Sequence, residues 1–383
     1  MKSFFKNKAI LSGVFMMIFY QIIMIGVFTS GYSAVPKNIG NLSVAIVNED
    51  KQYGMEFAKQ LEQELPFQVQ TDTDLKTAQQ KLEDRDIHLI MHIPQDFTQK
   101  LSAPDQQVQL DYYINQSNPA TTNSTVQNVV TQITEKISTQ LQTSGIEGVL
   151  QNMKMSEVQA KEMAAGIVNK VQANVIDSNP QPAGMHNQMA PMFLTMSSYV
   201  GAMIYSMMAI GALNQLKGKL GKWKAFLSLQ GTNAIISLIV PLIGLSIYFA
   251  IHGYGAGTFV HLWLLHALEL FAAIQFTSIF CLLFGQAGMM LNLPFLLIQT
   301  IANGSVVPQV MMPGFYKAIS HISVMFYTVQ LDYNLLFGGG RSAVLLLGLS
   351  LIMVSALALN TVIHHFKPYT KLSTGDAPQP LFM

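Results

Sequence analysis

The sequence contains few charges and only one cysteine. Charged residues make up 11% of its 383 positions, against about 25% in typical soluble domains. The net charge of +1 argues against a nucleic-acid partner, because phosphate binding requires a basic surface. Cys281 has no second cysteine with which to form a disulfide. Any domain outside the cytoplasm must therefore be held together by its own hydrophobic core.

Motifs for nucleotide hydrolysis and for metal or covalent catalysis are also missing. The patterns GxxxxGK[ST], GxSxG and HExxH match nowhere, and there is no pair of cysteines that could bind zinc. We therefore expect no enzymatic activity in this chain and no cofactor or metal bound to it.

Long apolar runs are abundant instead. A helix needs ~20 mostly apolar residues to cross a hydrocarbon core of about 30 Å. The first run, residues 9–30, could be a signal peptide, but it exceeds the apolar stretch of about 7–15 residues in a cleaved signal. We therefore favour a retained membrane anchor. Five further runs give six transmembrane helices in a 1+5 arrangement, and they cover residues 192–213, 225–250, 259–284, 289–307 and 342–363.

The charges are sorted by side of the membrane. Of the 21 acidic residues, 18 lie between Glu49 and Asp177, whereas the segments assigned to the cytoplasm hold nine lysines and one acid, Asp376. Lysine and arginine accumulate in cytoplasmic loops of membrane proteins. Both termini, including a tail over residues 372–383, are therefore predicted inside, and residues 31–191 outside. Arg341 is the one basic residue at an outer helix end.

The extracytoplasmic segment has the pattern of a small α/β (α+β) domain. Predicted strands over 42–47, 67–70, 87–93 and 107–115 alternate with predicted helices over 55–65 and 74–84, which favours a mixed or parallel sheet covered by helices. After Asn118 we expect a long amphipathic helix and then a second helical stretch over 146–175. These helices form either a stalk that returns to the membrane or a surface that packs on a partner.

Within the predicted membrane domain, residues 192–371, two ionisable side chains lie one helical turn apart. Glu269 follows His266 in the fourth apolar run. A carboxylate at that depth is costly unless it faces protein or water, so it is a functional candidate by default. Two interpretations remain open. Either Glu269 and His266 contact the substrate, or Glu269 forms a structural pair with His266 or with a polar group on a neighbouring helix. Two ligands without a third do not make a metal site.

The segment between the last two apolar runs is too apolar for a free loop, yet prolines and glycines interrupt it. It predicts two short helices over residues 308–340 that dip into the outer face of the membrane, where irregular backbone survives only if protein or a wet cavity surrounds it. We call residues 308–340 the re-entrant segment. Its candidate gate residues are Pro308, Pro313 and Tyr327.

Several stretches resemble a known family. "GSVVPQVMMPGFYKAISHISVMFYTVQ" is similar to the Gly-x-x-x-Pro and x-Pro-x-x-Tyr signature of ABC-2-type permeases, although Val324-Met325 stands where that family usually has Leu-Pro. "LSVAIVNEDKQYG", "HLIMHIPQDFTQKL" and "LDYYINQSN" resemble its phage-infection-protein branch. The resemblance extends over nearly the whole chain.

The resemblance implies the permease subunit of an ATP-driven exporter in a bacterial cell membrane. Two permease chains, as a homodimer or a heterodimer, would bind two separate ATPase subunits that carry ATP and Mg²⁺. The cargo would be amphiphilic or hydrophobic: a drug, a lipid or a peptide. The re-entrant segment would gate the outer exit, with Glu269 and His266 near the path. The ATPase would dock on residues 214–224, here called the elbow, whose candidate contacts are Asn214, Lys217, Lys219, Lys222, Trp223 and Lys224.

Two other functions remain open at this point. The first is a non-transporting surface protein, such as a phage receptor or a secretion-machine scaffold, in which the outer domain is the working part. The second is a proton-coupled carrier that uses Glu269, which the lack of an internal repeat disfavours. The lysines of the elbow also have a plainer explanation, since they are the orientation signal itself.

Overall fold

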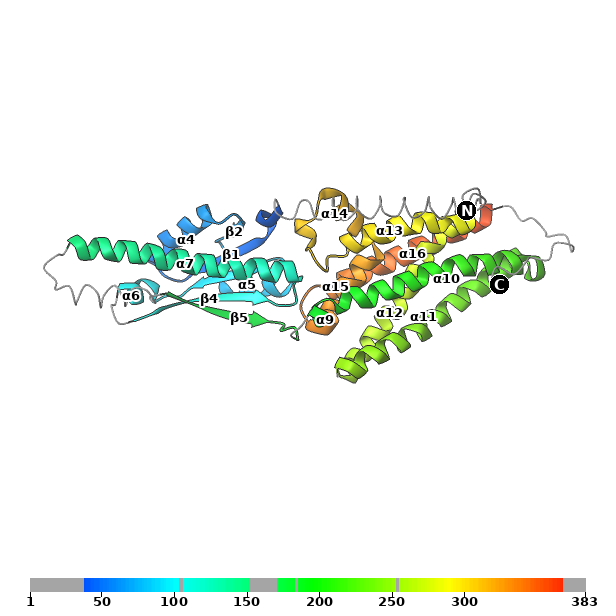
Figure 1. The fold of residues 1–383 in the computed structure, drawn as a ribbon, viewed down its shortest axis with the longest axis horizontal. Helices are drawn as coiled ribbons and strands as arrows, with labels where there is room; N and C mark the ends of the chain where they lie inside the picture. The colour runs from blue at the N-terminus through cyan, green and yellow to red at the C-terminus, as the bar shows by residue number, and fades with distance from the viewer. Residues whose placement is uncertain (1–37, 103–105, 152–170, 183–184, 253–254, 368–383) are drawn as a thin grey trace, which may run out of the picture.

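The computed structural model is an elongated molecule with an α/β domain at one end and a helical bundle at the other (Figure 1). It describes residues 38–102, 106–151, 171–182, 185–252 and 255–367. The predicted first transmembrane helix, residues 9–30, and the predicted tail, residues 372–383, lie outside the described residues. The predicted count of six transmembrane helices therefore stays a prediction.

The outer domain contains a five-stranded mixed sheet with the order β2-β1-β3-β4-β5. β1 pairs in parallel with β2 and β3, β3 pairs antiparallel with β4, and β4 pairs in parallel with β5. The expected mixed sheet is confirmed. Its strands are β1 (Ser43–Asn48), β2 (Gln68–Gln70), β3 (Leu89–Ile93), β4 (Val108–Asn115) and β5 (Val171–Ser178).

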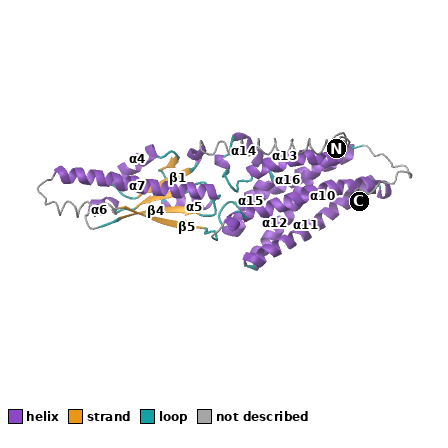
Figure 2. Cartoon of the chain, in the orientation of Figure 1, coloured by secondary structure: helices purple, strands orange, loops and turns teal. Residues whose placement is uncertain are grey.

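Helices cover both faces of this sheet (Figure 2). α4 (Tyr53–Glu64), α6 (Phe97–Ser102) and α7 (Ala120–Gln151) share one core with Leu110 and Tyr112. α5 (Leu75–Glu83) covers the other face. The apolar stripe over residues 126–137 of α7 is buried in the core of its own domain, so this part of the helix is neither a bare stalk nor a free partner surface. Its members are Val126, Val130, Ile133 and Ile137.

The second helix predicted over 146–175 is wrong at its C-terminal end. Val171–Ser178 forms β5, which runs parallel to β4 in a register that pairs Val171 with Val108. Along β5, apolar residues at 171, 173 and 175 alternate with polar residues at 172 and 174. This two-residue period is typical of a strand. The edge of β4 supplies the hydrogen-bonding partner that such a short segment needs.

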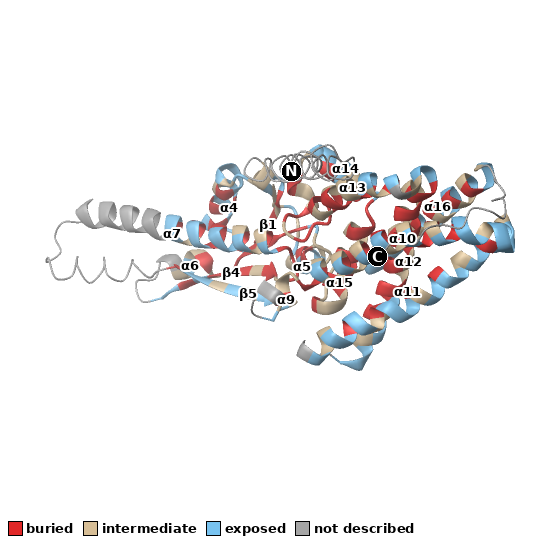
Figure 3. Ribbon diagram, turned by 45° about the vertical axis from the view of Figure 1, so that its right-hand side comes forward, coloured by how far each residue is buried: buried red, intermediate tan, exposed pale blue. Residues whose placement is uncertain are grey.

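Four described helices are long and apolar enough to cross a membrane. α12 is the central one, because 61% of its most apolar window is buried, against 22% for α11 and 11% for α16 (Figure 3). α13 (Gly288–Ala302) has 15 residues, about 22 Å of helix, and is shorter than a bilayer core. The four are α10 (Ala190–Leu220), α11 (Lys222–His252), α12 (Ala256–Phe284) and α16 (Ser342–Phe366).

The re-entrant segment folds back into the bundle. It contains two short helices, as expected, α14 (Gly314–Ser320) and α15 (Val324–Phe337), after a 3-10 turn, η3 (Gln309–Met311). α15 contacts α10, α12, α13 and α16. Most of α15 is therefore buried in the core of the bundle.

The outer domain is joined to the bundle at the end of α15. The backbone N–H of Gly340 donates to the carbonyl of Glu83 at 2.8 Å, and Arg85 Nη2 donates to the carbonyl of Gly338 at 3.1 Å. Arg341 forms ion pairs with Asp84 and Asp86. These carboxylates of the outer domain explain why a basic residue stands at this outer helix end. We call the contact of residues 83–86 with residues 338–341 the joint.

One buried histidine makes the stability of the outer domain depend on pH. His88 is 4% exposed, and its Nδ1 accepts a hydrogen bond from the N–H of Ser43 at 3.2 Å. Burial lowers its pKa from 6.5 to about 4. Below pH 6.5 the His88 side chain binds a proton in the unfolded chain but not in the folded domain. The free energy of unfolding is therefore highest above pH 6.5 and falls as the pH is lowered towards 4. The expected loss is about 3 kcal/mol.

Calorimetric unfolding of the full-length protein between pH 7 and pH 4.5 checks this expectation. His88→Asn keeps an acceptor near the Nδ1 position but does not titrate. The wild type should lose more stability than His88→Asn over this range, because other titrating groups affect both proteins equally. Parallel losses would contradict a neutral His88.

Candidate functional site

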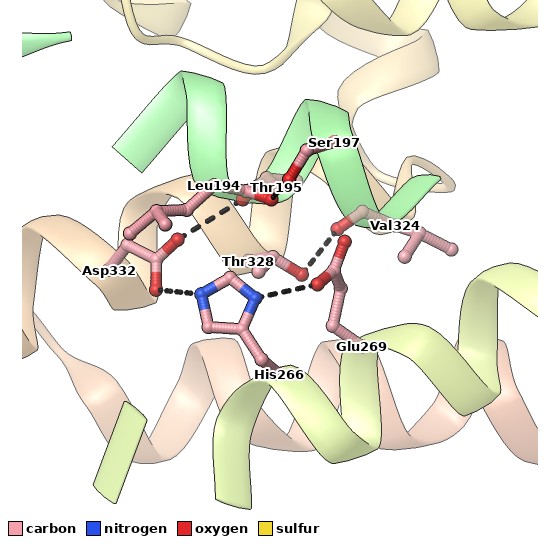
Figure 4. A network of polar contacts seen from close by, with 8 residues as sticks. All are labelled: Leu194, Thr195, Ser197, His266, Glu269, Val324, Thr328 and Asp332. Atoms are coloured by element: carbon pink, nitrogen blue, oxygen red, sulfur yellow. Dashed lines mark hydrogen bonds and ion pairs between the residues drawn. The ribbon is translucent and has the colours of Figure 1, made fainter. Parts of the chain in front are cut away.

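The candidate site lies where α12 meets α15 and α10 (Figure 4). His266 and Glu269 lie three residues apart on α12, a spacing that places them on the same helix face. His266 Nδ1 is 2.8 Å from Glu269 Oε2. The two residues selected from the sequence are therefore in direct contact, with exposed fractions of 2% and 0%.

Asp332 completes the site from α15. Its Oδ1 lies 3.1 Å from His266 Nε2, on the side of the ring opposite Glu269. The hydroxyl of Thr195, on α10, donates to Asp332 Oδ2 at 3.1 Å. We call His266, Glu269 and Asp332 the ionic cluster. It connects the re-entrant segment to two long helices.

Sequence reasoning missed Asp332, although a signal for it was present. Glu269 and Asp332 are the only acidic residues between positions 178 and 375. No local pattern connects Asp332 to His266, because His266 is 66 positions earlier in the chain. The exposed fraction of Asp332 is 0%, so the same argument about buried charge that selected Glu269 applies to it.

The cluster can hold protons and tether helices, but its geometry does not suit a metal ion. The two nitrogens of His266 face opposite carboxylates (Figure 4), so the three side chains do not converge on one point. Among the described residues there is no group of three or more His, Cys, Asp or Glu that could hold a metal ion.

Two apolar grooves lie elsewhere on the bundle. One, of about 470 Å³, is lined by α10 and α11, including Met208 and Leu213. The other, of about 320 Å³, is lined by Tyr327 with residues of α12 and α16. Neither groove is lined by His266 or Glu269.

At the elbow, Gly221 connects two continuous helices. Its φ of +85° is a left-handed conformation that glycine adopts without strain. Lys219, Trp223 and Lys224 are exposed there, as is Asn214, and Lys217 is half-buried. The predicted loop over 214–224 is thus mostly helix, and its exposed residues project from the ends of α10 and α11.

Lys222 has a different role from its neighbours. Its Nζ donates to the carbonyl of His365, in the last turn of α16, at 2.7 Å and to that of Lys367, just after the helix, at 2.8 Å. The ring of His364 stacks on Phe226 with centroids 4.3 Å apart. Lys222 therefore caps a helix C-terminus, where unpaired carbonyls favour a cation, and is less available for docking than Lys219 or Lys224.

The predicted gate residues lie at three separate places along the re-entrant segment. Pro308 and Pro313 immediately precede η3 and α14. Tyr327 lies on α15, and its hydroxyl donates to the carbonyl of His321 at 3.2 Å. The Tyr327 ring packs against Gly348 of α16, where an added Cβ would meet the ring at 2.2 Å.

These features define a multi-pass membrane protein with an α/β domain inserted before its main helical bundle. A sequence model described as "ABC-2 family transporter protein" matches residues 11–362. The chain therefore belongs to this family, as the resemblance of the re-entrant segment implied. The match supports the role of a membrane permease subunit that works with an ABC ATPase. No curated protein and no solved structure matches the chain.

Proposed function

We propose that this chain is the permease subunit of an exporter that moves an amphiphilic or hydrophobic cargo out of a bacterial cell. The family match over residues 11–362 carries the proposal. Because the chain has no nucleotide-binding loop, ATP and Mg²⁺ bind in a separate ATPase. Two permease chains form the conduit, and the outer domain faces away from the cytoplasm.

The apolar groove beside Tyr327 supports a cargo of this kind. It opens on the flank of the bundle between α12, α15 and α16, and most of its lining is apolar. A drug, lipid or peptide that partitions into the bilayer could reach the re-entrant segment along it. Movement of α15 would then open the outer exit, with Pro308 and Pro313 at the N-terminal end of the re-entrant segment.

The exposed part of the elbow supports ATPase docking. Lys219, Trp223 and Lys224 are exposed together at the end of the bundle far from the acidic outer domain. Lys219→Glu with Lys224→Glu should weaken retention of the ATPase during purification by about tenfold or more, because two attractive charges become repulsive. Export of the cargo should fall with it. Lys222 is left intact in this variant because it caps α16.

Lys51→Glu with Lys59→Glu makes the same charge change on exposed residues of the outer domain and should change neither property. The elbow variant keeps seven of the nine lysines assigned to the cytoplasm, so it should insert in the same orientation as the wild type. Accessibility labelling checks this orientation. If it inserts normally and keeps both its ATPase and its export activity, the docking proposal is wrong. If the wild type carries no ATPase, a non-transporting surface protein becomes the better assignment.

A further inference from the structure

The ionic cluster contains more groups that can carry a negative charge than groups that can carry a positive one. It has one imidazole and two carboxyl groups, so a protonated His266 between two ionised carboxylates leaves one negative charge. The exposed fractions of the three residues are 2%, 0% and 0%. An unbalanced charge in such a place is strongly unfavourable and is normally removed by a change in protonation.

A hydroxyl group from α10 reaches the cluster, because Thr195 donates to Asp332 Oδ2. On α15, Tyr333 follows Asp332, and the guanidinium of Arg85 lies 6.0 Å from the centre of the Tyr333 ring. That guanidinium is already bonded to Ser117 and to the Gly338 carbonyl. α13, which packs on α10, α12 and α15, contains no titratable residue.

We infer that the ionic cluster is a proton-binding site that holds one proton beyond the one on His266, and that Glu269 carries it. The site is then neutral, with an imidazolium, an ionised Asp332 and a protonated Glu269. Asp332 is the better-stabilised carboxylate because it receives the hydroxyl of Thr195 as well as the contact with His266. Glu269 contacts His266 through Oε2 alone, and its Oε1 has no hydrogen-bond partner among the described residues.

Binding of this proton is coupled to the position of α15. If α15 moves away from α12, Asp332 leaves the cluster, and His266 with an ionised Glu269 forms a neutral pair. The proton on Glu269 is then released. The closed arrangement binds one proton more than the open one, so a rise in pH favours opening, by at most about tenfold per pH unit for a single proton. This step rests on the proposed gating role of the re-entrant segment.

Infrared spectroscopy of the full-length protein in lipid nanodiscs at neutral pH tests the proton site directly. A protonated carboxyl has a C=O stretch separate from the bands of ionised carboxylates. The wild type should show this band. Glu269→Gln and Asp332→Asn should each abolish it, because a single carboxylate is balanced by His266. His266→Gln should about double it, since both carboxyls must then be neutral.

Asp72→Asn, an exposed substitution in the outer domain, is the matched control and should leave the band unchanged. A wild type without the band, or a band that survives both Glu269→Gln and Asp332→Asn, would overturn the inference. If His266→Gln does not fold, the two carboxyl variants still decide the question. This experiment uses neither cargo nor ATPase, so its failure would leave the exporter assignment intact.

Thiol labelling tests the coupling to α15. Cys281 is the only native cysteine, so Thr328→Cys in a Cys281→Ala background places one buried thiol on α15. Lys317→Cys in the same background places an exposed thiol in a reference protein. The labelling rate of Thr328→Cys, divided by the labelling rate of Lys317→Cys, should rise with pH. It should not depend on pH once Asp332→Asn is added. A ratio that is independent of pH in both proteins would refute the coupling, while the infrared result would still stand.

Discussion

Replacing His266 with alanine should destabilise the folded bundle more than any other single substitution in the ionic cluster. The change leaves Glu269 and Asp332 buried, with exposed fractions of 0%, and removes the cation between them. Removing one partner of a buried ion pair costs about 3–5 kcal/mol. Thermal unfolding midpoints of the detergent-solubilised protein would show the loss. It should shrink as the pH is lowered, because protonated carboxyls no longer need a counter-charge.

Two comparison variants separate this charge effect from loss of packing. His261→Ala removes an exposed histidine from the same helix and should change the midpoint little. The triple variant His266→Gln, Glu269→Gln and Asp332→Asn keeps the shapes of the side chains but carries no charge, and it should recover most of the stability that His266→Ala loses. A triple variant as unstable as the alanine variant would show that packing, rather than charge, explains the loss.

Local patterns were enough to predict much of the outer domain. The strand at Ser43–Asn48 and the helix at Tyr53–Glu64 follow from apolar runs and from a 3.6-residue period. The order of strands in the sheet did not follow, because pairing depends on contacts between distant segments. The prediction of helix as far as residue 175 was wrong, because the strand that begins at Val171 pairs with β4, more than 50 residues earlier in the chain.

The candidate site was predicted only in part, for the same reason. The contact of His266 with Glu269 follows from their helical spacing, whereas the contact with Asp332 depends on α15 lying inside the bundle. Long-range contacts also give two basic residues partners that local patterns could not predict. Arg341 is matched by Asp84 and Asp86 of the outer domain, and Lys222 is bonded to backbone carbonyls at the C-terminal end of α16.

Replacing Gly338 with alanine should loosen the joint between the outer domain and α15. The φ of Gly338 is +96°, and an added Cβ would lie 2.4 Å from Asn179 Oδ1. Asn179 cannot move freely, because its Nδ2 donates to Glu83 at 2.8 Å and to Asn115 at 3.2 Å. Backbone strain of this kind costs roughly 1–3 kcal/mol. Hydrogen exchange at the Gly340 amide, which donates to Glu83, should accelerate by about 5- to 150-fold.

Gly221→Ala is the matched control for backbone strain. Gly221 also has a positive φ, +85°, but nothing lies within 4 Å of an added Cβ, so its substitution should leave exchange at the joint unchanged. Adding Asn179→Gly to Gly338→Ala removes the clash and should restore part of the protection, although the hydrogen bond to Glu83 is lost. If Gly338→Ala leaves exchange at Gly340 and at residues 83–86 unchanged, the joint is not a rigid contact. Movements of α15 would then not be transmitted to the outer domain through these residues.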